Sequence, residues 1–161
     1  MNNYILSLGS NLGERKKNLD RGLRFLSEIG RIIKKTPIYE TLPVEMEETS
    51  NFYNMVVEFE VELSPVELLN KIKDYEKSEG RDIKNSHLKP RTIDIDILLN
   101  EDNTVNEKNL IIPHKEITNR YFILFLLNKL NPEIIINNKR VKNILLYQKK
   151  EENHYILRKI D

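Results

Sequence analysis

The stretch from Pro90 to Leu99, Pro-Arg-Thr-Ile-Asp-Ile-Asp-Ile-Leu-Leu, constrains the fold of this chain more than any other. Three isoleucines alternate there with Asp94 and Asp96, and a period of two is the signature of a β-strand with one buried face. Because alternate side chains of a strand share a face, both carboxylates project the same way, with their Cα atoms roughly 6.5–7 Å apart. The stretch therefore predicts a strand that is apolar on one side and carries an acidic pair on the other.

The acidic pair points to a metal site. Two neighbouring carboxylates repel each other and raise each other's pKa, a cost that a chain tolerates most readily where a divalent cation lies between them. Mg²⁺ is usually held by one or two carboxylates together with substrate phosphates. The ordinary alternative is an amphipathic edge strand with two solvated aspartates. Aspartate is depleted in strands, so the pattern favours the metal site.

Composition narrows the function classes. The 161 residues predict one domain, 1–161, with a substantial core. The 26 basic and 25 acidic residues leave a net charge of +1, which argues against both nucleic acid and anionic membranes as partners. There is no cysteine, so thiolate metal sites and cysteine nucleophiles are excluded. The first residues lack a basic leader pattern and no apolar run reaches membrane-spanning length, so we expect a soluble cytoplasmic protein.

The other segments alternate between strand and helix patterns. In chain order we predict strand 4–8, glycine-rich turn 9–13, a helix from residue 14 to a glycine cap at 30, strand 31–41, exposed loop 42–51, strand 52–61, a helix from the capping box at 64–67 to the glycine at 80, strand 90–99, polar turn 100–109, extended segment 110–114, helix 121–127 stopped by Pro132, and hairpin 134–141. The glycine-rich turn fits neither phosphate-binding loop pattern and is interpreted as structural. The tail from 147 to 161 is charged and uninformative.

This order of elements defines a fold class. The succession β-α-β-β-α-β predicts an α+β, ferredoxin-like core, an antiparallel sheet with helices packed on it, followed by a C-terminal helix and a small hairpin. Such folds carry many functions, so function has to be argued from the site.

Two polar residues lie where apolar ones are expected. Asn54 lies within a strongly apolar strand. Its side-chain amide either makes a local hydrogen bond or binds a heterocyclic ligand through its donor and its acceptor. Glu76 lies four residues after Ile72 on the buried stripe of its helix and therefore needs a partner. That partner is Arg81 or a backbone amide in the ordinary case, and the acidic pair's metal site or its nucleotide in the functional one.

A basic loop leads into the acidic strand. Residues 81–91 contain five cationic side chains if His87 is counted, a composition that suits neutralisation of a polyphosphate. The alternative is a solvated loop in which Arg91 pairs with Asp94. His114 follows a proline at a strand end; it is either structural or a donor to phosphate.

These residues together resemble the 6-hydroxymethyl-7,8-dihydropterin pyrophosphokinases of folate biosynthesis. The resemblance extends from the glycine-rich turn to the hairpin near residue 140. Its specific parts are Phe52-Tyr53-Asn54, Glu76 with Gly80-Arg81, Pro90-Arg91-Thr92-Ile93-Asp94-Ile95-Asp96, and Pro113-His114 with Asn119-Arg120-Tyr121-Phe122.

The resemblance implies a reaction and a set of site residues. The enzymes of this family transfer pyrophosphate from ATP to the hydroxymethyl group of the pterin and release AMP. By position, two Mg²⁺ ions are bound by Asp94 and Asp96, and charge on the phosphates is stabilised by Arg81 and Arg91. If a side chain takes the alcohol proton, Asp96 is the candidate. The implied pterin-binding residues are Thr41, Leu42, Val44, Phe52, Asn54 and Phe122. The implied nucleotide-binding residues are Lys73, Glu76, Arg81, Lys84, Arg91, Ile97, His114 and Lys115.

The chain also departs from the family pattern. Leu88 and Lys89 replace the aromatic residue and the glycine that often precede the Pro-Arg pair, Ile83 replaces an arginine, and Lys115 replaces a tyrosine. Lysines offer point charges rather than forked donors, so we expect altered substrate affinity and not a loss of chemistry. The loops 42–51 and 81–90 are expected to close over the substrates and exclude water. The oligomeric state implied is a monomer or weak dimer.

Two other function classes compete with this reading. Asp-x-Asp pairs also serve nucleotide-sugar and phosphoester enzymes, although these normally use larger parallel sheets. A non-enzymatic binding module for RNA or metabolites is the second rival, but an RNA-binding sheet needs exposed aromatic motifs and a basic surface, and neither is evident.

Overall fold

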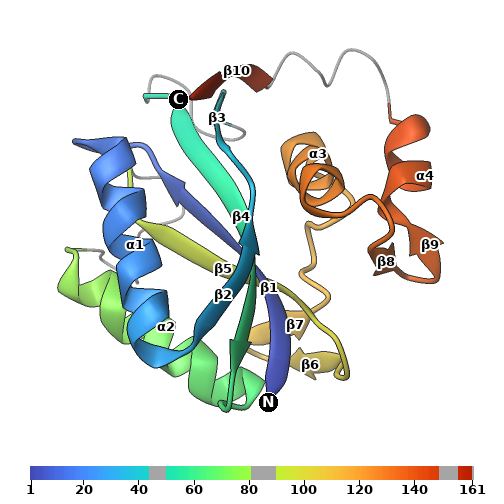
Figure 1. The fold of residues 1–161 in the computed structure, drawn as a ribbon, viewed down its shortest axis with the longest axis horizontal. Coiled ribbons are helices and arrows are strands. Elements are labelled where there is room, and N and C mark those ends of the chain that lie inside the picture. The colour runs from blue at the N-terminus through green and yellow to red at the C-terminus, as the bar shows by residue number, and fades with distance from the viewer. Residues whose placement is uncertain (44–49, 81–89, 149–155, 161) are drawn as a thin grey trace.

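A twisted antiparallel sheet forms the centre of the computed structural model, which describes residues 1–43, 50–80, 90–148 and 156–160 (Figure 1). The strand order is β10-β3-β4-β1-β5, and β2 also pairs with β4. The strands are β1 (Asn2–Ser10), β2 (Arg31–Lys35), β3 (Ile38–Thr41), β4 (Phe52–Val61), β5 (Asp94–Asn100) and β10 (Ile156–Ile160). All pairings are antiparallel, with β1 between β4 and β5, so the predicted ferredoxin-like class is confirmed.

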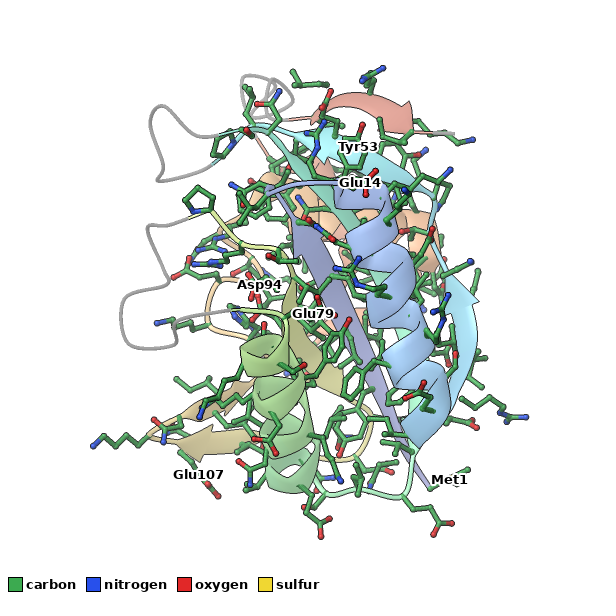
Figure 2. All side chains as sticks on the ribbon, turned by 90° about the vertical axis from the view of Figure 1, so that its left-hand side faces the viewer. Met1, Glu14, Tyr53, Glu79, Asp94 and Glu107 are labelled. Atoms are coloured by element: carbon green, nitrogen blue, oxygen red, sulfur yellow. The ribbon has the colours of Figure 1, made fainter. Side chains whose placement is uncertain are left out.

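Two helices cover one face of this sheet. Helices α1 (Arg15–Ile29) and α2 (Pro65–Ser78) lie in front of the strands in Figure 2. They contact each other through stacked Phe25 and Tyr75 rings, whose centroids are 4.2 Å apart. The predicted capping box of α2 is present, because the Ser64 hydroxyl accepts from the Glu67 amide and the Glu67 carboxylate accepts from the Ser64 amide. The main core fills the space between these helices and the sheet.

A second apolar cluster lies on the opposite face of the sheet. Helix α3 (Tyr121–Leu130) packs there against β4, and the neighbouring elements are α4 (Val141–Leu146) and the hairpin β8 (Ile135–Ile136) with β9 (Lys139–Arg140). Asn137 and Asn138 both have positive φ angles, as a two-residue hairpin turn requires. The sheet is thus covered on both faces, by α1 and α2 on one side and by α3 on the other.

Glycine at the end of α1 has a steric reason. Gly30 has an extended backbone, yet an added Cβ would lie 2.5 Å from the carbonyl oxygen of Glu60 and 2.6 Å from the Phe59 ring. The close approach of β4, and not a left-handed turn, therefore requires glycine at this helix end.

Several predicted boundaries differ from the structure. The single strand expected over 31–41 is two strands, because the chain departs from the ladder at Thr36-Pro37 while Thr36 remains bonded to Val56 through both its amide and its hydroxyl. The polar turn 100–109 contains β6 (Val105–Glu107), which pairs with β7 (Leu110–Ile112). Gly9 and Ser10 belong to β1 and not to the following turn. No element was predicted for residues 142–146, which belong to α4, and the tail from 147 to 161, interpreted as uninformative, contains β10, which pairs with β3.

Candidate functional site

The acidic pair lies on β5 as the alternation predicted. Ile93, Ile95 and Ile97 are at most 4% exposed, and the two aspartates are half-buried on the other face. A β-bulge at Leu98 lets Ile97 pair with Leu6 and Leu99 pair with Ile5. Because this irregularity comes after Asp96, the two carboxylates keep the common orientation that regular alternation produces.

Arg91 is the cation next to this pair. Its guanidinium Nη1 lies 2.6 Å from Oδ2 of Asp94, and the two side chains are only 13% and 14% exposed. The ion pair that the sequence offered as the ordinary alternative is therefore present. It offsets part of the repulsion between the two carboxylates.

One register position links the acidic pair to the predicted pterin residues. Gly9 of β1 pairs with Asn54 of β4 on one side and with Asp94 of β5 on the other. Directly opposed residues share a face, so Asn54 and Asp94 stand on the same face, about 10 Å apart across β1. The Asn54 amide is buried and donates to the Thr41 hydroxyl at 2.7 Å.

Glycine at this register position has a steric reason. A Cβ added to Gly9 would lie 2.6 Å from Oδ1 of Asn54 and 3.5 Å from the Phe52 ring. The missing side chain therefore lets the Asn54 amide lie over β1, with its carbonyl toward Gly9 and its NH₂ bonded to Thr41. Phe52 lies beside the same position, and Leu42 and Phe122 are half-buried, Phe122 against the cluster under α3.

A cavity of about 200 Å³ lies beside β5. It brings together Asp96, Ile97, His114 and Lys115, four residues predicted from the sequence to hold metal or nucleotide. The sequence reasoning did not assign roles to the other lining residues, which are Leu69, Ile95, Lys108, Asn109, Leu110 and Ile111. In the sequence, the feature that could have indicated these lining residues is the short apolar strand immediately before His114. Lys73 is half-buried on α2 but does not line this cavity.

His114 is held in one tautomer at the cavity. Its Nδ1 accepts a hydrogen bond from the Glu116 amide at 3.1 Å, and its own amide donates to the Leu98 carbonyl at 2.9 Å. Burial, followed by the positive charge of Arg120, lowers the pKa of His114 below its usual 6.5. The ring is therefore neutral at pH 7, and because Nδ1 is an acceptor, Nε2 carries the proton and is a hydrogen-bond donor.

Glu76 connects α2 to the acidic strand. It is 4% exposed, and its Oε2 accepts from the Ile95 amide at 3.0 Å. A backbone amide, one of the partners weighed from the sequence, is thus confirmed as a partner. This bond fixes the segment of β5 between the two aspartates.

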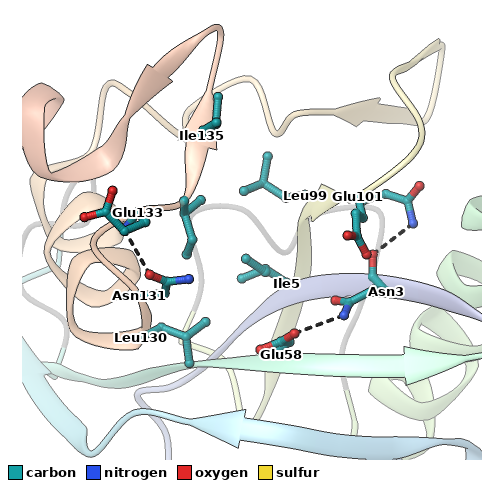
Figure 3. Close-up of a pocket in the computed structure, with 11 residues that line it drawn as sticks. Asn3, Ile5, Glu58, Leu99, Glu101, Leu130, Asn131, Glu133 and Ile135 are labelled. Carbon is teal, nitrogen blue, oxygen red and sulfur yellow. Dashed lines mark hydrogen bonds between the residues drawn. The ribbon is translucent and has the colours of Figure 1, made fainter.

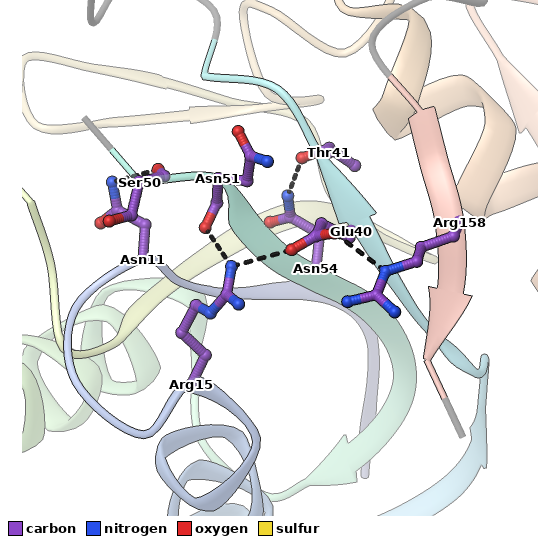
Figure 4. Close-up of polar contacts among 8 residues, drawn as sticks. All are labelled: Asn11, Arg15, Glu40, Thr41, Ser50, Asn51, Asn54 and Arg158. Carbon is purple, nitrogen blue, oxygen red and sulfur yellow. Dashed lines mark hydrogen bonds and ion pairs between the residues drawn. The ribbon is translucent and has the colours of Figure 1, made fainter. Parts of the chain in front are cut away.

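The turn after β1 takes part in the site's construction, which sequence reasoning missed. Asn11 is 1% exposed and bonds to Arg91. It also bonds to Ser50 (Figure 4). Arg15 donates to the Asn51 carbonyl at 2.8 Å and pairs with Glu40 at 3.0 Å, while its guanidinium lies over the Tyr53 ring. No local pattern reveals these contacts, since the partners are 25 to 80 residues away.

A larger hollow lies elsewhere on the molecule. Its volume is about 400 Å³, and it lies between the far ends of β1 and β5 and the segment after α3 (Figure 3). Ile5, Leu99 and Leu130 line it together with polar groups such as Asn3 and Glu58. It contains none of the residues that the sequence proposed for substrate, nucleotide or metal.

Some predicted residues lie outside the described part of the chain. These are Val44, Arg81 and Lys84, and the departures at Ile83, Leu88 and Lys89. Separately, among the described residues no helix has both the length and the apolar character needed to cross a membrane.

Comparison with known proteins identifies relatives over most of the chain. Residues 5–132 match the family model of 7,8-dihydro-6-hydroxymethylpterin-pyrophosphokinase (HPPK). A 2-amino-4-hydroxy-6-hydroxymethyldihydropteridine pyrophosphokinase of Aquifex aeolicus is 37% identical over 135 residues, which cover 84% of each protein. The bifunctional protein FolKE of Lactococcus lactis is 40% identical over 126 residues, 77% of this chain and 36% of that protein.

Solved structures show the same fold. The HPPK-DHPS of Plasmodium falciparum, crystallised with pteroate, has a TM-score of 0.72 at 21% identity over 90% of this chain and 44% of that one. The chain spans about a third of the length of several curated relatives that it matches, including FolKE and a folate synthesis bifunctional protein of Arabidopsis thaliana. On the match of residues 5–132 and the identity to the Aquifex protein, the chain belongs to the 7,8-dihydro-6-hydroxymethylpterin-pyrophosphokinase family.

Proposed function

We propose that this protein transfers pyrophosphate from ATP to the hydroxymethyl group of 6-hydroxymethyl-7,8-dihydropterin and releases AMP. The observation that carries the proposal is the register position of Gly9, which sets the carboxylate of Asp94 and the amide of Asn54 on one face of the sheet. In this proposal the metal–phosphate site and the heterocycle site lie next to each other, on either side of β1. Family membership supplies the identity of the two substrates.

In the proposed reaction the hydroxymethyl oxygen bonds to the β-phosphorus of ATP. The bond from that phosphorus to the oxygen bridging the α-phosphate breaks, AMP leaves, and the alcohol proton passes to a base. The Asp96 carboxylate is the proposed acceptor of that proton. Little covalent work falls to the protein, whose contribution is to position the two substrates in line and to stabilise charge.

Asp94 and Asp96 are the proposed ligands of two Mg²⁺ ions. The two carboxylates are half-buried on one face of β5, and Asp96 also lines the cavity along that strand. Such a pair fits the oxygen donor set that Mg²⁺ shares with nucleotide phosphates. Bound Mg²⁺ neutralises the phosphates and holds their oxygens in place. Arg91, which pairs with Asp94, is proposed to donate to the phosphates together with Arg81.

The cavity along β5 is proposed to receive the nucleotide. Nε2–H of neutral His114 can donate to a phosphate at any pH above the lowered pKa of that ring. Ile97 and Lys115 line the cavity, and Leu69 and Leu110 add apolar surface for a base. We also assign three further residues to nucleotide binding: Glu76, Lys73 and Lys84.

The pterin is proposed to bind between β4 and α3. Asn54 offers both a donor and an acceptor to the heterocycle, and Thr41 fixes the orientation of its amide. Phe52 and Phe122 are proposed as the two stacking faces, and Leu42 and Val44 as backbone contacts. That residues 1–161 act as one domain, as a monomer or weak dimer and in the cytoplasm, stays a prediction.

The proposal is tested by product analysis. The purified protein is incubated with ATP, Mg²⁺ and the reduced pterin, and nucleotides are separated by ion-exchange chromatography. We expect AMP and the pterin diphosphate in equal amounts, and no AMP without the pterin. Asp96→Asn should lower the rate by at least about 100-fold, the scale of removing one charge-stabilising group. ADP or phosphate as the product would favour a phosphoester enzyme, and binding without turnover would favour a binding module.

A further inference from the structure

Asn11 joins two segments that are distant in sequence. It follows β1 directly and is 1% exposed. Its amide N–H donates to the Arg91 carbonyl at 3.0 Å, and its side-chain Oδ1 accepts from the Arg91 amide at 2.7 Å. Its Nδ2 donates to the Ser50 carbonyl at 3.3 Å. One side chain therefore bonds to two backbones that lie 80 and 39 residues away.

Only an amide of this size can make both side-chain bonds. Aspartate keeps the acceptor but has no donor for Ser50, and alanine has neither. Asn11 itself is 1% exposed. In a variant without Oδ1 the Arg91 backbone N–H loses this acceptor, and a shielded group left without a partner costs more than the bond itself contributes. The two side-chain bonds, one accepted from Arg91 and one donated to Ser50, thus explain why position 11 is an asparagine.

The two segments belong to opposite sides of the proposed site. Arg91 pairs with Asp94 at 2.6 Å and so belongs to the metal and phosphate side. Ser50 stands two residues before Phe52 and four before Asn54, on the pterin side. Arg15 holds the same side independently, through the Asn51 carbonyl at 2.8 Å. Among the hydrogen bonds of the described residues, those of Asn11 are the ones that tie Ser50 to Arg91 through a single side chain.

We propose that Asn11 is a positioning residue that sets Arg91 relative to the segment 50–52 and thereby couples the binding of the two substrates. The inference rests on the proposed function, since it assigns Arg91 to the nucleotide and the segment 50–52 to the pterin. Asn11 acts through the two backbones that it holds. Its removal should therefore change how each ligand responds to the other, in addition to changing each affinity.

The test measures binding by calorimetry in four proteins: wild type, Asn11→Ala, Asn11→Asp and Asn18→Ala. The probes are a non-hydrolysable α,β-methylene analogue of ATP with Mg²⁺, and 6-hydroxymethylpterin. Each is titrated alone and in the presence of the other, so that the factor by which one ligand changes the affinity for the other is obtained. Thermal unfolding of each variant is recorded in parallel.

Asn11→Ala should lower the affinity for each ligand by about tenfold, the effect of one lost hydrogen bond with a buried partner. It should also bring the coupling factor toward one. Asn11→Asp keeps the acceptor for Arg91 and should weaken mainly the pterin. It also keeps the test decisive should Asn11→Ala not fold. The matched control is Asn18, which is 4% exposed and donates to the Ser10 hydroxyl and the Leu12 carbonyl but to neither distant segment. Asn18→Ala should lower stability and leave the coupling factor unchanged.

Two results would count against the inference and are distinguishable. If Asn11→Asp or Asn11→Ala shows the coupling factor of the wild type, or changes it no more than Asn18→Ala does, Asn11 is only structural and the inference is wrong while the proposed function stands. If the wild type itself binds neither the pterin nor the ATP analogue, the proposed function fails and the inference fails with it.

Discussion

Arg91 and Asp94 form an ion pair of 2.6 Å, three residues apart, at the beginning of β5. Both side chains are largely shielded from solvent, so the pair is stronger than an ion pair on an open surface. The same aspartate is the proposed metal ligand. The fold itself therefore places a cation where Mg²⁺ and phosphates are proposed to bind.

Removing this cation should expose the carboxylates to Mg²⁺. In Arg91→Met we expect Mg²⁺ without nucleotide to stabilise the fold, by about 1.4 kcal/mol at ten times its Kd, because the ion no longer competes with the guanidinium. The wild type should show a smaller shift. The measurement is the thermal midpoint against MgCl₂ concentration. Arg21→Met, which removes the 2.9 Å ion pair to Glu79 immediately after α2, is the control. An equal response in the two variants would contradict the prediction.

Gly9→Ala should disturb the pterin side selectively. The added Cβ would lie 2.6 Å from Oδ1 of Asn54, so that amide must move and its bond to Thr41 is lost. We expect pterin affinity to fall about tenfold or more, with the affinity for an ATP analogue nearly unchanged. Calorimetry with the two ligands checks this. Thr41→Val, which removes only the hydroxyl that accepts from Asn54, should give a smaller loss; equal losses of both ligands in Gly9→Ala would refute the explanation.

His114 should make stability depend on pH. Its folded-state pKa lies below the unfolded value of about 6.5, so the unfolded chain binds its proton first as pH falls. The contribution of the neutral ring is fully present above pH 6.5 and is lost as pH falls toward the folded pKa. His114→Asn retains an acceptor for the Glu116 amide but does not titrate. Urea unfolding between pH 7.5 and 5 should therefore show a steeper decline for the wild type, and parallel curves would disprove the assignment.

The attachment of the last strand, β10, should depend on the charge of Glu40. This buried carboxylate lies 3.0 Å from Arg15 and 3.0 Å from Arg158 of β10 (Figure 4). Burial alone would raise the pKa of Glu40, but the hydrogen bonds from Arg158 and then Arg15 outweigh it and hold that pKa below 4.5. The stabilisation is present above pH 4.5 and is lost as pH falls through the folded pKa.

Arg158→Met should therefore raise the pKa of Glu40 and move acid unfolding to higher pH. The matched control is Arg31→Met, which removes a 2.6 Å ion pair with Glu60 whose arginine is similarly exposed. Circular dichroism during acid titration measures both midpoints. A larger shift for Arg31→Met than for Arg158→Met would show that the burial of Glu40 does not matter.

Local sequence patterns predicted much of the scaffold. The alternation of side chains along a strand and the residue preferences at helix ends and turns depend on only a few neighbouring residues. The alternation at Ile93–Ile97 predicted the buried and polar faces of β5, and Ser64-Pro65-Val66-Glu67 predicted the start of α2. The same reasoning failed at Thr36-Pro37, where pairing of both flanking segments to β4 made two strands of one. It also missed β10, whose five residues do not alternate between apolar and polar and which pairs with β3.

The sequence by itself therefore determined the strand that carries Asp94 and Asp96, the buried face beneath them, the order of elements and, through its motifs, the family. Only the tertiary structure decided which residues stand beside that pair: Arg91 on Asp94, Asn54 across Gly9, His114 in the cavity, and Asn11 between Arg91 and Ser50. The physical reason is the separation along the chain of the residues that interact. A strand's two faces follow from neighbouring residues, whereas a hydrogen bond between Asn11 and Arg91 spans 80 residues and exists only once the sheet has brought its ends together.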